Sequence, residues 1–186
     1  MNRIVKIIAL VLLLAMLASS LFVALAASEV KELPRADDVA GERTGVADYT
    51  LTTLDGKELR LSSLRGKPVL LDFFSATCQH CQAHAPFIVE MARKYPTLTV
   101  INLASNNQFV DGEKVEEYRR AANIKNTIAY APYALFAAYL QPNEQGIVGV
   151  PQAVLFDAQG KITAHFTKWT DADKPAIEAA IAKQIK

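Results

Sequence analysis

The sequence predicts an α/β domain in which helices flank a mixed β-sheet. Apolar runs at 69–74, 98–103 and 152–156 have the length and composition of strands buried on both faces. Helical segments alternate with the first of these strands, which favours parallel pairing. Asp-Gly at 55–56 and a turn at 157–160 each separate two strand-like segments, the pattern of an antiparallel hairpin.

The order of elements follows from these signals and from the helical segments between them. In chain order we expect strands at 49–53 and 58–61, a strand at 69–74, a helix over 78–95, a strand at 98–103, helices over 112–122 and 133–140, strands at 152–156 and 161–166, and a final helix capped by Thr170 or Asp171. Pro86 lies inside the first helix and is expected to kink it or to end its first part.

Composition limits the classes of partner. The chain has 186 residues and a formal net charge of +1. Arg3 and Lys6 are the only charged residues in the first 27, and without them 18 basic and 19 acidic residues remain, a net of −1. A nearly neutral domain lacks the basic footprint of a nucleic-acid-binding protein, so we expect no nucleic-acid partner.

The N-terminus has the composition of a targeting segment. After Arg3 and Lys6 comes an uncharged, mostly apolar stretch, with Ala24-Leu25-Ala26 near its end. We therefore expect residues 1–27 to be a signal peptide or an N-terminal membrane anchor. Both alternatives export the domain, to the periplasm or the outer face of the membrane, and an anchor would tether it there.

Two boundaries follow from composition. Residues 28–45 are mixed and charged, contain Pro34 and Gly41, and are expected to form a linker. Residues 46–186 form the predicted domain.

The only two cysteines, Cys78 and Cys81, stand three positions apart, after a buried strand and at the start of a helix. The free N–H groups and the positive dipole end of a helix N-terminus favour a thiolate, the form that attacks a disulfide. This setting predicts Cys78 as the nucleophile and Cys81 as the resolving thiol, with exchange through a mixed disulfide.

Metal binding is the alternative use of this cysteine pair. Structural zinc sites usually need four ligands, and the only histidines are His80, His84 and His165. Cys78, Cys81 and His84 would suit part of a copper or zinc site, but we expect no metal and no cofactor in the native role. A chance pairing of two cysteines is the third interpretation.

Two titratable side chains near the cysteines are candidate modifiers. A protonated His80 would stabilise the Cys78 thiolate and make the disulfide more oxidising, unless it is simply exposed to solvent. Asp72 lies within an apolar strand, where burial raises the pKa of a carboxyl group. It would accept the Cys81 proton through a water molecule, unless a neighbouring lysine satisfies it or it lies at a strand edge. We expect His84 to lie on the surface and His165 to be structural.

Gly149-Val150-Pro151 precedes the third buried strand, and proline is allowed at a strand start. A cis bond before Pro151 would set the backbone of Val150 against the cysteine pair. An extended substrate would then bind Val150 by strand addition.

Together these motifs resemble the thioredoxin superfamily, and more closely its exported TlpA/ResA-like branch, which is allied to the AhpC/TSA redoxins. The matching segments span roughly 46–186: Asp48–Lys57, Leu61–Val69, Leu71–Cys78, Pro86, Gly149–Pro151 and Phe156–Lys161. The resemblance implies a thioredoxin-like fold with an N-terminal β-hairpin extension and a redox-active Cys78–Cys81 disulfide. It also implies a cis Pro151 that faces the substrate, and Asp72 as the buried acid of proton transfer.

The sequence departs from the family pattern beside the cysteines. Thr77 stands where the family usually has Trp, and Gln79-His80 replaces the Pro-Pro, Glu-Pro or Gly-Pro pairs common in this branch. A histidine before the second cysteine resembles the oxidising DsbA site. Residues 123–149 form a longer segment than usual. Thr77, Gln79 and His80 are therefore expected to tune the site.

The resulting prediction is an enzyme, a thiol–disulfide oxidoreductase that acts on exported proteins as a disulfide reductase, with cytochrome c maturation as one setting. Its partners would be protein disulfides or dithiols and a membrane-bound or exported electron donor. A DsbA-like oxidase and a copper-binding module that uses Cys78, Cys81 and a histidine are the alternatives. A peroxidase is disfavoured, because the Pro-x-x-x-Thr-x-x-Cys pattern of peroxiredoxins is absent before Cys78.

Overall fold

The computed structural model describes residues 48–143, 145–167 and 170–185. The predicted signal peptide or anchor at 1–27 and the linker at 28–45 lie outside the described residues, as do the first two residues of the predicted domain. Within the described part of the chain, no helix has both the length and the apolar character needed to cross a membrane.

A mixed sheet of seven strands forms the centre of the described domain, in the order β2-β1-β5-β4-β3-β6-β7. The strands are β1 (Thr50–Thr53), β2 (Glu58–Arg60), β3 (Val69–Phe74), β4 (Thr99–Ala104), β5 (Thr127–Tyr130), β6 (Gln152–Phe156) and β7 (Ile162–Thr167). β3, β4 and β5 pair in parallel, and the other pairs are antiparallel.

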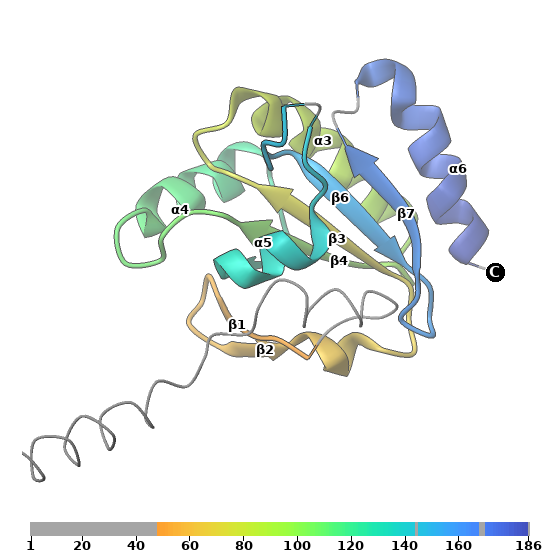
Figure 1. Cartoon of the computed structure of the whole chain (residues 1–186), viewed down its shortest axis with the longest axis horizontal. Coiled ribbons are helices and arrows are strands. Elements are labelled where there is room, and N and C mark those ends of the chain that lie inside the picture. The colour runs from red at the N-terminus through yellow and green to blue at the C-terminus, as the bar shows by residue number, and fades with distance from the viewer. Residues whose placement is uncertain (1–47, 144, 168–169, 186) are drawn as a thin grey trace, which may run out of the picture. The chain divides into compact units, whose positions relative to one another are not determined.

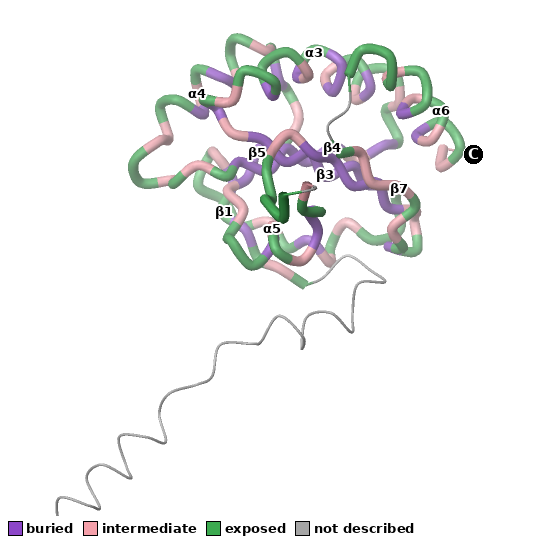
Figure 2. Tube along the Cα trace, turned by 45° about the horizontal axis from the view of Figure 1, so that its top comes forward, coloured by how far each residue is buried: buried purple, intermediate pink, exposed green. Residues whose placement is uncertain are grey.

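Four α-helices and two 3-10 turns accompany the sheet. They are α3 (Gln79–Lys94), α4 (Gly112–Ala121), α5 (Tyr133–Tyr139) and α6 (Lys174–Gln184), with η1 (Leu61–Leu64) and η2 (Asp171–Asp173). Helices α3, α4 and α6 cover one face of the sheet and α5 covers the other (Figures 1 and 2). The predicted α/β class is confirmed, including both hairpins.

The alternation of side chains along β3 divides the core. All six residues of this strand are buried, as expected for a strand covered on both faces. Leu71 and Phe73 pack in the cluster under α5, whereas Leu70 and Phe74 pack on the face that carries α3. Asp72 lies on that second face, between Leu70 and Phe74. A carboxyl group thus lies in the centre of the sheet, on the face covered by α3, and the two cysteines lie at the N-terminus of this helix.

Two details differ from the sequence prediction. Strand β5 was not expected, because Thr127–Tyr130 is short and no hairpin turn marks its ends. Helix α3 continues through Pro86 to Lys94, so the expectation that Pro86 ends the first part was wrong. Pro86 and Gln82, whose carbonyl group loses its helical partner, are both exposed, and solvent can satisfy that carbonyl.

Candidate active site

The cysteine pair lies at the N-terminus of α3, directly after the carboxyl end of β3. Cys78 is the N-cap residue, and its Sγ accepts a hydrogen bond from the Cys81 backbone N–H at 3.2 Å. Both cysteines are free thiols. Cys78 is partly exposed, whereas Cys81 is only 1% exposed. The geometry therefore presents Cys78 to solvent and keeps Cys81 inside.

Neighbouring side chains fix the turn that delivers Cys78. The Cys78 N–H bonds to the Ser75 carbonyl at 3.1 Å. The Ala76 N–H donates to Oδ1 of Asn106 at 2.9 Å, and the Ala76 carbonyl accepts from Nε2 of Gln82 at 3.0 Å. Asn106 follows β4, so the parallel sheet brings it to the same edge as the cysteines. Neither Asn106 nor Gln82 was among the site residues expected from the sequence.

The segment before β6 faces the exposed cysteine, as predicted. The Cys78 thiol donates to the Val150 carbonyl, with 3.7 Å between Sγ and the oxygen. The Val150–Pro151 peptide bond is cis, as the resemblance implied. Residues 72 positions apart in the chain thus come into contact at one edge of the sheet.

Asp72 is buried in the middle of the sheet rather than at a strand edge. Its side chain is on β3, and its residue partners on the two neighbouring strands are Asn102 and Ala153, neither of which is a lysine. Burial raises the pKa of Asp72 to about 7. Among the described residues no lysine contributes to this shift, which contradicts the alternative of an acid satisfied by a neighbouring lysine. A carboxyl group with this pKa exchanges a proton near neutral pH.

The surroundings of Cys81 keep its thiol protonated and fix its backbone. Burial is the first cause that raises the pKa of its thiol, followed by the hydrogen bond with Cys78 and, less strongly, by the charge of Asp72. The buried hydroxyl of Tyr118 donates to the Cys81 carbonyl at 3.0 Å. The Tyr118 ring stacks on Phe74, with 4.4 Å between ring centroids. Cys81 therefore stays protonated until a base removes its proton.

Thr77, Gln79 and His80 are all exposed around Cys78. The Thr77 hydroxyl lies 3.2 Å from that of Ser75. His84 is half-buried one turn further along α3, and burial, then the charge of His80, lowers its pKa. His165 lies on β7, where burial lowers its pKa as well. Of the three histidines, His80 is the one exposed beside the cysteines.

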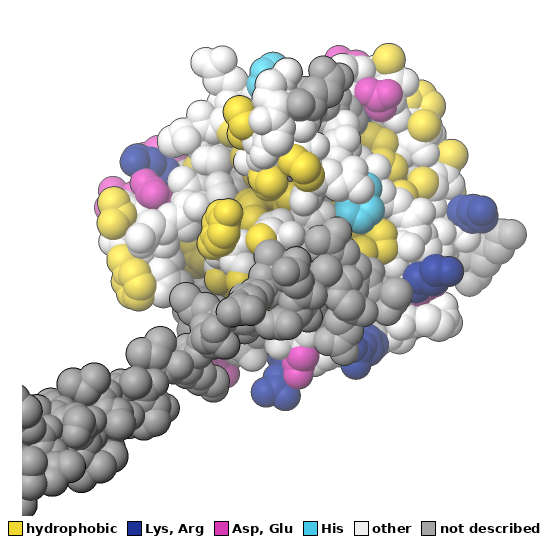
Figure 3. Space-filling model, viewed as in Figure 1, with side chains coloured by type: hydrophobic (Ala, Val, Ile, Leu, Met, Phe, Trp, Pro, Cys, Tyr) yellow, Lys and Arg dark blue, Asp and Glu magenta, His cyan; other side chains and the backbone are white. Residues whose placement is uncertain are grey.

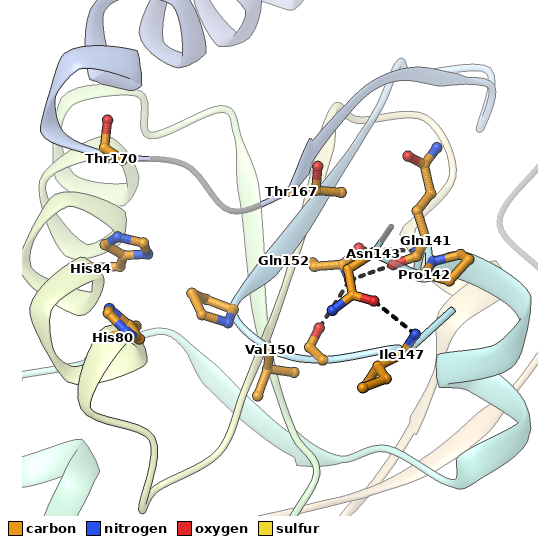
Figure 4. A pocket seen from close by; sticks show the side chains of 12 residues that line it. His80, His84, Gln141, Pro142, Asn143, Ile147, Val150, Gln152, Thr167 and Thr170 are labelled. Atoms are coloured by element: carbon orange, nitrogen blue, oxygen red, sulfur yellow. Dashed lines mark hydrogen bonds between the residues drawn. The ribbon is translucent and has the colours of Figure 1, made fainter. Parts of the chain in front are cut away.

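A cavity of about 640 Å³ adjoins the site, between α3 and the segment that follows α5 (Figure 4). Its lining includes His80, His84, Val150 and Pro151. Large exposed apolar side chains also lie in the loop after β4, at the start of α5 and in the loop before β6: Phe109, Val110, Tyr133, Ile147 and Val148. Figure 3 shows hydrophobic side chains gathered on this face of the molecule. In the part of the chain that the structure describes, no three His, Cys, Asp or Glu side chains group to hold a metal ion.

Residues 43–165 match the model of the AhpC/TSA family. The thiol–disulfide oxidoreductase ResA of Geobacillus thermodenitrificans is 30% identical over 132 residues, which cover 68% of this chain and 72% of that protein. The match to ResA of Bacillus thuringiensis and Bacillus cereus spans 63% of each relative, slightly less than two thirds of its length.

Solved structures share the fold. A secreted Mycobacterium tuberculosis disulfide oxidoreductase, described as homologous to E. coli DsbE, is 26% identical with a TM-score of 0.60, over 73% of this chain and 96% of that one. A thioredoxin family thiol:disulfide interchange protein from Chlorobium tepidum has a TM-score of 0.64 at 23% identity, over 77% and 97%. These comparisons confirm the thioredoxin-like fold and the predicted class of enzyme, a thiol–disulfide oxidoreductase. The chain belongs to the AhpC/TSA family.

Proposed function

We propose that the chain reduces disulfide bonds in exported proteins, with Cys78 and Cys81 as its redox pair. One observation carries the proposal: the partly exposed Cys78 sulfur accepts the Cys81 N–H, while Cys81 itself is buried within reach of the charge of Asp72. A metal site would need further ligands beside this pair. An exchange enzyme needs one accessible thiolate and one protected thiol, and the two cysteines divide these requirements between them.

The first step forms a mixed disulfide. The Cys78 thiolate attacks one sulfur of the client disulfide, and the other client sulfur leaves as a thiolate that takes up a proton. The Cys81 N–H and the free N–H groups at the start of α3 stabilise the negative charge before attack. The client is then joined covalently to Cys78.

The second step releases the client. Cys81 loses its proton to Asp72 through a water molecule and attacks the Cys78 sulfur. The second client sulfur leaves as a thiolate that takes up a proton, and the Cys78–Cys81 disulfide closes. Two electrons pass to the client, and an electron donor must return them. Asp72 suits the role of base because burial brings its pKa to about 7.

The backbone of Val150 and Pro151 offers the client its docking edge. The Val150 carbonyl already accepts a hydrogen bond from the Cys78 thiol. An extended client segment would add beside this edge as a strand, with its own N–H groups in place of that donor. Main-chain recognition of this kind is tolerant of client sequence.

Thr77, Gln79 and His80 would tune the potential and the choice of client. They are exposed around Cys78, so each can reach a bound partner. Positive charge on His80 would stabilise the thiolate and favour oxidation of clients, the alternative direction. Reduction is the proposed direction because the resemblance to the exported TlpA/ResA-like branch favours it, and relatives that match over most of the chain are named thiol–disulfide oxidoreductase ResA.

The setting is also part of the proposal. The apolar segment within 1–27 supports export, either as a signal peptide or as a tether at the outer face of the membrane. A membrane-bound or exported donor would reduce the pair again. Cytochrome c maturation is a suitable setting, since apocytochromes present cysteine pairs that must be reduced before haem attachment.

Two variants test the mechanism. The Cys78→Ala variant should lose exchange with hydroxyethyl disulfide, and turnover equal to wild type would overturn the mechanism. The Cys81→Ala variant should still attack client disulfides and should accumulate mixed disulfides with exported clients, which mass spectrometry identifies.

The reduction potential of the Cys78–Cys81 pair gives the direction of electron flow. A value of about −270 mV supports a reductant, and one of about −120 mV supports a DsbA-like oxidant.

A further inference from the structure

A buried glutamine follows the cis proline. Gln152 is the first residue of β6, and only 6% of it is exposed. Its neighbours Ala153 and Leu155 pack on the α3 face, so Gln152 points to the opposite face, toward α5. Neither apolar packing nor the proposed thiol chemistry requires an amide here. A buried amide costs free energy unless its polar atoms find partners.

All of the partners of this amide lie on one neighbouring segment. Oε1 of Gln152 accepts the Gln141 N–H at 3.0 Å, and Nε2 donates to the Gln141 carbonyl at 2.8 Å and to the Gly149 carbonyl at 2.9 Å (Figure 4). One side chain thus binds residues 141 and 149, and we call the described residues of this stretch, 141–143 and 145–149, the clamped segment. Both donors and the acceptor of the amide are used.

Between its two ends the clamped segment has a defined turn. Oδ1 of Asn143 accepts the Gln145 N–H at 3.0 Å and the Ile147 N–H at 2.8 Å. Pro142 and Val148 form an antiparallel bridge. Hydrogen bonds to Gln152 therefore hold the two ends of the clamped segment together, and hydrogen bonds to Oδ1 of Asn143 fix its turn.

The clamped segment forms one wall of the cavity beside the cysteines. Asn143 and Ile147 lie across this cavity from His80 and His84 of α3, with the docking edge at Val150 between the two walls (Figure 4). Ile147 is 63% exposed. No Asp, Glu, Lys or Arg lines the cavity among the described residues.

We propose that Gln152 is a positioning residue that holds the clamped segment as the outer wall of a client groove beside Cys78. The occupant is the stretch of extended client polypeptide on one side of its reactive cysteine. A strand that adds at Val150 continues into this groove, and Ile147 offers an apolar contact for an uncharged client side chain. This assignment rests on the proposed exchange function and names how its clients are selected.

The test compares a peptide substrate with a small one in the full-length chain. The probes are a cyclic peptide closed by one disulfide, which reaches the groove, and hydroxyethyl disulfide, which is too small to contact it. For Gln152→Leu, the ratio of kcat/KM for the peptide to kcat/KM for the small disulfide should fall about tenfold, mainly through KM. The matched control is Gln159→Leu at the exposed turn after β6, which should leave the ratio unchanged.

A second variant guards against loss of folding. Asn143→Ala removes the two bonds of the turn without opening the core, and should lower the same ratio in the same direction. A ratio equal to wild type in the folded variants overturns the positioning role, even if both rates fall together. Failure of the wild-type chain to reduce hydroxyethyl disulfide would instead refute the proposed function itself.

Discussion

At the scale of single residues, the buried carboxyl group of Asp72 links pH to turnover. As the proposed base it acts only when ionised, and its pKa is about 7. The rate of peptide disulfide reduction should therefore rise as pH increases through 7. The Asp72→Asn variant should lose this rise and fall by about a hundredfold at alkaline pH. Stopped-flow pH profiles check this, with exposed Glu117→Gln as control, and an unaltered profile in Asp72→Asn would remove Asp72 from the mechanism.

The same carboxyl group should cost stability where it is ionised. The folded chain binds the Asp72 proton more tightly than the unfolded chain, so its effect is most favourable in acid and is lost as pH rises toward 7. Between about pH 5 and about pH 8, the free energy of unfolding of Asp72→Asn should therefore gain on wild type by about 3 kcal/mol. Urea denaturation at both pH values measures the difference. Equal pH dependence in the two proteins would contradict it.

His80 is expected to act on the reduction potential of the Cys78–Cys81 pair. It is exposed one residue before Cys81, close enough to the pair for its charge to act on the thiolate. Removing a charge that stabilises the reduced form should make the potential of His80→Gln more negative, by about 30 mV. Equilibration with glutathione gives the value, and the matched control is Gln79→Ala. An unchanged potential would assign His80 a surface role.

The site residues that could be predicted are those that stand in a recognisable local sequence pattern. The spacing of Cys78 and Cys81, the apolar run around Asp72 and the proline at 151 each carry a local signal. Asn106 and Gln152 do not, since an amide in or beside a loop is common, and its meaning depends on which carbonyl or N–H the fold brings to it. Contacts between distant segments become visible only when the strands are placed.

At the scale of elements, the loop after β4 supports the turn that begins α3. The Ala76 N–H is held by Asn106, and Ala76 is only 6% exposed. Asn106→Ala leaves this donor without its partner and should lower the free energy of unfolding by about 1–2 kcal/mol. Urea denaturation measures this, and Gln108→Ala in the same loop is the control. A loss no larger than that of the control would show that the turn stands without Asn106.

Elements were predicted where their pattern is long or their boundary is marked. The buried runs of β3, β4 and β6 and the hairpin turns at both ends of the domain gave correct strands. Strand β5 has four residues and gains its place by pairing with β4 and β1 on either side, which no local pattern shows. Packing against the sheet also allows α3 to continue past Pro86, because buried apolar residues lie on both sides of this proline.

At the scale of the whole molecule, redox state and stability are coupled. A reductant is a protein whose folded state favours the disulfide more than its unfolded state does, so oxidation stabilises it. We expect the oxidised chain to unfold at a higher urea concentration than the reduced chain. The Cys78→Ala, Cys81→Ala double variant is the control and should not respond to the redox buffer. A more stable reduced form would indicate a DsbA-like oxidant.

The N-cap position of Cys78 has a further consequence. The sulfur that reacts is also the atom that accepts the N–H of Cys81, so each change in its bonding alters the first turn of α3. A thiolate is a strong acceptor, a thiol a weaker one, and a disulfide sulfur carries no net charge. The Cys81 amide is therefore a built-in reporter: its proton chemical shift and its exchange with solvent should register every covalent state of the enzyme in turn.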